Sequence, residues 1–126
     1  MPDLLFEYAV IRVVPRVERE EFINVGVIVY CPKQKFLKAM LHLDDARISA
    51  LAPTLDLDCL KDNIASLERI TNGDPNGGPI ARLDQPSRFR WLTATRSTVV
   101  QASKVHPGLC TDAEATLVKL FKQLVE

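Results

Sequence analysis

The 126-residue chain lacks several residues and patterns on which common activities depend. It has three cysteines, Cys31, Cys59 and Cys110, which lie far apart and form no C-x-x-C pair, and it has two histidines. A zinc site is therefore not expected. A sparse, odd number of cysteines fits reduced thiols and hence a cytoplasmic protein.

Long apolar runs and an excess of either charge are also missing. No segment is long enough to span a bilayer, and the first residues, MPDL, have neither the basic nor the long apolar region of a signal peptide. Sixteen basic residues balance sixteen acidic ones, so no overall charge attracts nucleic acid or membrane. We expect a cytoplasmic protein without membrane association.

No internal repeat, low-complexity tract or glycine-rich phosphate loop is present. The sequence favours a non-enzymatic protein, and we expect no catalytic residue, metal or cofactor. A length of 126 residues with 47% hydrophobic and 25% charged residues predicts one globular domain over residues 1–126.

The stretch that organises the chain is residues 20–30, which reads as a strand inside a sheet. Four β-branched residues share one parity and hence one predicted face: Ile23, Val25, Val27 and Val29. The other face is also mostly apolar, so we expect both to be covered. It is interrupted by Gly26, which indicates a bulge or a close approach, and by Asn24. The Asn24 amide needs partners, either in the adjoining turn, which we favour, or on a ligand.

The remaining elements follow from periodicity and capping signals. Strands are predicted over residues 5–14 and 36–43, which complete an antiparallel meander, and one or two weaker strands over residues 89–102. Helices are predicted over residues 46–52, 58–70 and from a capping box at Thr111 and Glu114 nearly to the last residue. Residues 73–87 hold three glycines and three prolines and are predicted to form a flexible loop. The fold class is α+β, an antiparallel sheet packed by two main helices.

The densest group of candidate binding residues lies in residues 88–98. Its members are Arg88, Arg90, Trp91, Arg96, Ser97 and Thr98. Guanidinium groups and hydroxyls suit phosphate or carboxylate, and a tryptophan can stack on a base. The alternative, which we favour, is that Trp91 anchors a strand while the arginines face solvent or pair with Glu20 and Glu21.

Asn24 and His106 complete the candidate set. His106 lies in the stretch VHPG, predicted to be a turn before the last helix. It could act as a general base, although a turn histidine bonded to backbone is the favoured interpretation. Cys110 precedes the same helix, whose N-terminus could lower a thiol pKa, but we interpret it as a packing residue.

Four segments resemble a known family. They are YAVIR at residues 8–12, EFINVGV at 21–27, RFRWLTATRSTV at 88–99 and VHPGL at 105–109. Together they resemble a small bacterial family catalogued only as a domain of unknown function. The resemblance implies no activity or cofactor. It implies a context, because members look like frequent gene neighbours of HipA-like serine/threonine kinases, the toxins of toxin–antitoxin modules.

The sequence is therefore compatible with two functions. The first is a non-enzymatic interaction or regulatory module whose partner is a HipA-like kinase. The second is a site for phosphate, nucleotide or RNA, with or without hydrolysis, in residues 88–98. An exposed edge strand would also allow a homodimer.

Overall fold

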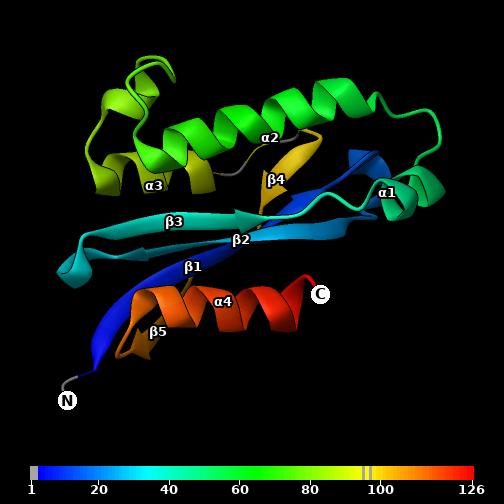
Figure 1. Ribbon diagram of the computed structural model, residues 1–126. Helices are drawn as coiled ribbons and strands as arrows, with labels where there is room; N and C mark the ends of the chain where they lie inside the picture. The colour runs from blue at the N-terminus through cyan, green and yellow to red at the C-terminus, as the bar shows by residue number, and fades with distance from the viewer. Residues whose placement is uncertain (1–2, 95, 97) are drawn as a thin grey trace.

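The computed structural model describes residues 3–94, 96 and 98–126, which form strands, α-helices and short 3-10 turns (Figure 1). The strands are β1 (Leu4–Val13), β2 (Ile23–Cys31), β3 (Phe36–Leu41), β4 (Val100–Ala102) and β5 (His106–Cys110). The helices are α1 (Asp45–Leu51), α2 (Leu57–Asn72), α3 (Gln85–Thr93) and α4 (Ala113–Leu124). The 3-10 turns are η1 (Val17–Arg19), η2 (Pro32–Gln34) and η3 (Ile80–Arg82).

The strands form one antiparallel sheet in the order β3-β2-β1-β4, and β5 also pairs with β1. The α+β class and the meander of the first three strands are confirmed. β2 is an interior strand, as predicted, and β1 pairs with β2, β4 and β5. Figure 1 shows α2 and α3 on one face of the sheet and α4 on the other, so both faces are covered.

A bulge in β2 overturns the predicted grouping of its side chains. The register between β1 and β2 steps from Ile11↔Gly26 to Arg12↔Asn24, so Val25 is an extra residue. Val25 therefore packs on the α2 face, whereas Val27 packs on the α4 face. The single-face prediction was wrong because a bulge changes the alternation by one residue. The irregularity predicted from Gly26 is confirmed.

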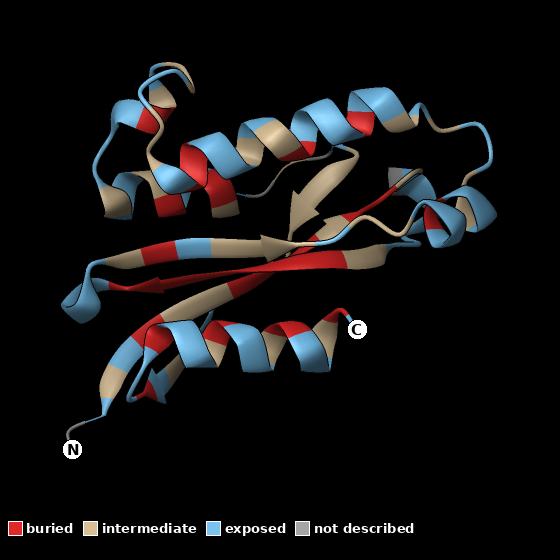
Figure 2. Cartoon of the chain, viewed as in Figure 1, coloured by how far each residue is buried: buried red, intermediate tan, exposed pale blue. Residues whose placement is uncertain are grey.

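Each sheet face has its own apolar core, and buried residues lie along β1 and β2 in Figure 2. On the α2 side, the ring of Phe89 in α3 packs at a tilt against that of Tyr30 in β2, with ring centroids 5.2 Å apart. On the α4 side, Leu117 and Phe121 pack against Val27 and neighbouring residues of the sheet. Burying side chains of this size stabilises the fold by about 1.5–3 kcal/mol each.

Helix α3 corrects the strand predicted to begin at Phe89. The Asp84 carboxylate accepts a hydrogen bond from the Ser87 amide at 2.9 Å, and Pro86 occupies the first turn. An N-cap aspartate followed by proline is a helix start, and it outweighs the β propensity of Phe89 and Trp91. The predicted loop over residues 73–87 contains η3 and the first turn of α3, and its flexibility stays a prediction.

Helix α4 forms where predicted, but its cap differs. Asp112, not Thr111, is the N-cap residue, and its carboxylate accepts from the Glu114 amide at 3.3 Å. Gln34 of η2 adds two bonds, because its Oε1 accepts from the Ala113 amide at 2.9 Å and its Nε2 donates to the Thr111 carbonyl at 3.3 Å. Asp112 and the distant Gln34 thus together take the place of the predicted capping box.

Within the part of the chain that the structure describes, no helix combines the length and apolar character needed to cross a membrane.

Candidate functional site

Arg88, the first residue of the predicted patch, is folded back into the corner between α2 and α3. Its Nη1 donates to the Leu83 carbonyl at 2.7 Å. A Cβ added at Gly73, the left-handed cap of α2, would lie 3.2 Å from the Arg88 Cζ atom. Its Nε is buried and has no partner among the described residues. Arg88 therefore packs in the helix corner and is turned away from a surface ligand.

Trp91 and Arg96 form the most definite contact of the patch. The Arg96 guanidinium lies 4.1 Å from the centre of the Trp91 ring, and its Nη2 donates to the Trp91 carbonyl. Trp91 is 40% exposed, so the pair is accessible to a ligand. Arg90 is exposed on α3, and Ser97 lies outside the described residues.

Trp91, Arg96 and Thr98 line one hollow between α2, α3 and β4, which we call the Trp91 pocket. Its volume is about 520 Å³. Its other polar lining residues are Asn63, Ser66 and Gln101. No carboxylate is among the described residues that line it, so its one charged group is a cation. A floor of apolar side chains with a cation and a few neutral donors suits a flat, anionic molecule.

The structure brings neither Asn24 nor His106 to this pocket. The Asn24 Nδ2 donates to the Leu124 carbonyl at the end of α4, at 3.0 Å, so the amide ties helix to sheet rather than serving the adjoining turn. Its Oδ1 is buried without a partner among the described residues. His106 begins β5, which corrects the predicted turn, and its ring centre lies 5.3 Å from that of Tyr8. The two residues therefore do not form one cleft with Arg96.

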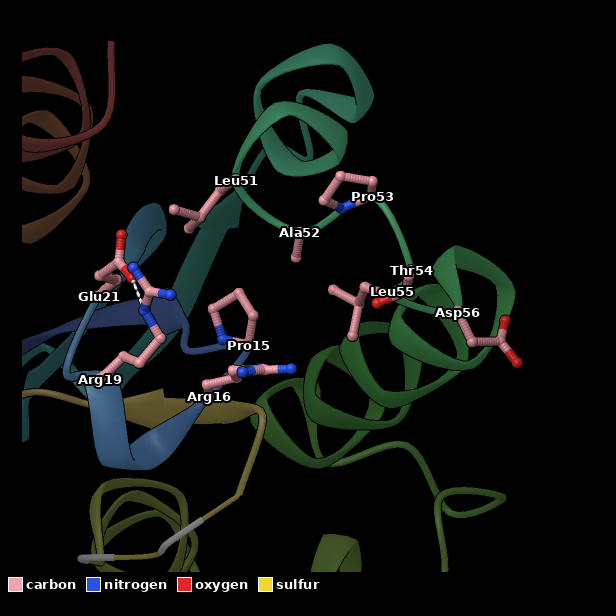
Figure 3. A pocket seen from close by; sticks show the side chains of 10 residues that line it. All are labelled: Pro15, Arg16, Arg19, Glu21, Leu51, Ala52, Pro53, Thr54, Leu55 and Asp56. Carbon is pink, nitrogen blue, oxygen red and sulfur yellow. Dashed lines mark hydrogen bonds and ion pairs between the residues drawn. The ribbon is translucent and has the colours of Figure 1, made fainter.

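A second hollow, which the sequence did not predict, lies between the β1–β2 connection and the α1–α2 connection (Figure 3). Its volume is about 450 Å³. Figure 3 shows Pro15 facing Leu55 across it, with Arg19 bonded to Glu21 at its border. Arg19 is paired with Glu21, whereas Arg16, which also lines the hollow, has no ion pair among the described residues. The available sequence signal was the run of charges in residues 16–21, but such a run between two predicted strands also fits a solvated connection.

Cys110 behaves as a packing residue. It is 6% exposed and lies in the α4-side core with Cys31. Burial, followed by the neighbouring Cys31 thiol, raises the pKa of Cys110. Because the thiolate is the reactive form, a raised pKa makes a nucleophilic role unfavourable.

An exposed apolar surface lies at one end of the sheet. Leu5 of β1 and Leu109 of β5 stand directly opposite each other, and they are 55% and 66% exposed. The exposed Pro107 of β5 follows two residues away on the same face. We call Leu5, Pro107 and Leu109 the Leu5–Leu109 surface. This surface was not predicted from the sequence, because the alternation of residues along a strand does not show which part of the strand a helix leaves uncovered.

A family model described as "Protein of unknown function (DUF3037)" matches residues 8–125. The chain belongs to the DUF3037 family. The predicted membership in a family of unknown function is thereby confirmed. No curated protein matches the chain, and no solved structure matches it.

The region matched by DUF3037 reaches from within β1 to the residue after α4. It contains the whole Trp91 pocket, together with Pro107 and Leu109. Leu5 precedes it. The family description specifies no ligand or reaction.

Proposed function

We propose that this protein is a non-enzymatic interaction module that binds a protein partner through the Leu5–Leu109 surface. The observation that carries the proposal is the exposure of two leucines at facing positions of paired strands. Contiguous apolar side chains on a soluble domain mark interaction sites more often than isolated ones do. The paired strands fix the backbone at both leucines, so a partner that covers them has to order only their side chains.

The partner we propose is a HipA-like kinase, whose activity the module would modulate. Support for this choice comes from the four sequence segments and the gene neighbourhood that they imply. The balanced charge of the chain, sixteen residues of each sign, adds no electrostatic preference, so apolar contact has to supply the affinity.

Co-expression with the neighbouring kinase followed by size-exclusion chromatography tests the proposal. We expect co-elution of the wild type and separate elution of the Leu109→Ser variant. Val118→Ser is the matched control, because Val118 is 37% exposed on α4 and away from the surface. Separate elution of the wild-type protein and the kinase at micromolar concentration would contradict the proposal. So would an equal loss of co-elution in Leu109→Ser and Val118→Ser.

The Trp91 pocket supports a second candidate function, the binding of phosphate, nucleotide or RNA. Its lining joins an aromatic face to one guanidinium, with no carboxylate among the described lining residues. Of the residues predicted for this role, Trp91, Arg96 and Thr98 line the pocket. Ser97 lies outside the described residues.

Titrations with nucleotides and a short RNA at two salt concentrations test this candidate. Binding in the pocket should weaken at higher salt and should be lost in Arg96→Gln. Arg90→Gln should bind as the wild type does, because Arg90 lies on α3 outside the pocket. Equal affinities of wild type and Arg96→Gln would remove the pocket from consideration.

A further inference from the structure

The outer edge of β3 is an unpaired strand edge of six residues. β3 is the terminal strand of the sheet on the side away from β4 and β5 (Figure 1). Its sequence, FLKAML, contains one charged residue and no proline. Native proteins block exposed edges with charged side chains, proline, bulges, short strands or a covering segment, and the charge and proline devices are represented in β3 by Lys38 alone.

The hydrogen-bond pattern shows which backbone groups face outward. The His42 amide donates to the Val25 carbonyl at 2.7 Å, and Leu41 lies opposite Gly26. Because bonding alternates along an antiparallel strand, Leu37, Ala39 and Leu41 direct their amides and carbonyls away from β2. None of these amides and carbonyls makes a backbone hydrogen bond to another described segment.

We propose that β3 pairs with β3 of a second copy of this chain, about a twofold axis at Ala39, which forms a homodimer with a continuous sheet. This register places Leu37 opposite the second copy's Leu41 and uses all three outward-facing residues. Alanine at the axis leaves room for the two side chains that face each other there.

Charge selects this register over its neighbour. An axis one residue earlier would set Lys38 directly opposite the same lysine of the second copy, and facing like charges destabilise a strand pair. With the axis at Ala39, Lys38 faces the second copy's Met40. Each lysine keeps its own counter-charge, because the Lys38 Nζ lies 3.0 Å from Glu114 Oε1 on α4.

The homodimer does not depend on the proposed kinase partner. The Leu5–Leu109 surface lies on β1 and β5, and β2 separates these strands from β3. A dimer would leave both copies of that surface free and present two partner sites.

Sedimentation equilibrium over a concentration series is the first test. We expect the mass of the wild type to rise from 14.1 kDa towards twice that value, and Ala39→Pro to stay monomeric. Proline is tolerated at an edge position whose amide faces solvent, and circular dichroism checks that the variant folds. A monomeric wild type at every concentration would overturn the proposal.

Cross-linking tests the register and does not rely on Ala39→Pro. The background is Cys59→Ser, since Cys59 is exposed whereas Cys31 and Cys110 are buried. Paired residues at the axis have Cα atoms about 5.5 Å apart, within disulfide range. In a glutathione redox buffer, Ala39→Cys should form disulfide-linked dimers. Lys33→Cys, in the exposed turn η2, is the control, and equal cross-linking of both variants would contradict the axis.

Discussion

Gly26 is the residue on which the geometry of β2 depends. A Cβ atom added there would lie 2.7 Å from the Met40 carbonyl oxygen and would overlap the Leu41 side chain. Gly26 alternates with Ile28 and Tyr30 and therefore lies on the face that Leu41 covers. The glycine is therefore a packing requirement of the sheet and no opening for a ligand.

Gly26→Ala should destabilise the protein. Because part of the overlap is with backbone that cannot rotate away, we expect the free energy of unfolding to fall by about 1–3 kcal/mol. Urea denaturation of wild type and variant measures the difference. In a Leu41→Ala background the penalty should shrink without vanishing, because the Met40 carbonyl remains. An unchanged denaturation midpoint would show that the strands separate easily at this position.

Single residues were predictable where the cause was local. Gly26 indicated its own bulge, because a glycine inside a strand often marks a bulge or a close approach of another backbone. Asn24 could not be assigned from the sequence, since its partner, the Leu124 carbonyl, lies 100 residues away. Trp91 was expected to anchor a strand, with an accessible stacking surface as the alternative, and it lies on a helix with 40% of its surface exposed.

At the scale of elements, α3 depends on its cap. Asp84 accepts hydrogen bonds from Ser87, and these bonds, together with the nearby Arg88 charge, lower the pKa of Asp84. A carboxylate with a lowered pKa in the folded state stabilises the fold above its unfolded pKa of about 4. That contribution is lost as the pH falls through the lower folded value.

Removing the Asp84 carboxylate should therefore lower the stability of the fold near neutral pH but not in acid, where the carboxylate is protonated. We expect Asp84→Ala to melt below the wild type at pH 6 and the gap to narrow as the pH falls below about 4. Thermal melts followed by circular dichroism at several pH values give this comparison. Asp84→Asn keeps a capping oxygen, so at pH 6 its melting temperature should lie between those of the wild type and Asp84→Ala. A gap that is independent of pH would exclude the charged cap as the cause.

Helices and strands were predictable where the residues that indicate them lie next to one another in the sequence. The strands of the meander and helices α1, α2 and α4 follow from periodicity and caps that lie within a few residues of one another. α3 was missed because aromatic residues close together favoured a strand, although Asp84 and Pro86 offered a helix start. The Trp91 pocket needs α2, α3 and β4 together, and no single segment encodes that meeting.

At the scale of the whole molecule, the sheet separates the candidate surfaces. The edge of β3 lies at one border, and β5, with the Leu5–Leu109 surface, pairs on the far side of β2. The Trp91 pocket lies against the face covered by α2 and α3. Self-association, partner binding and ligand binding can thus be tested one at a time in variants of the same chain.

The central claim is that a protein partner covers the Leu5–Leu109 surface, and amide hydrogen exchange tests it most directly. Exchange is compared for the chain alone and for the chain co-purified with the proposed HipA-like kinase. We expect slower exchange in β5 and at the start of β1 in the complex, with α2 unchanged. Equal exchange of β5 in the two samples, or slowing confined to α2, would contradict the claim.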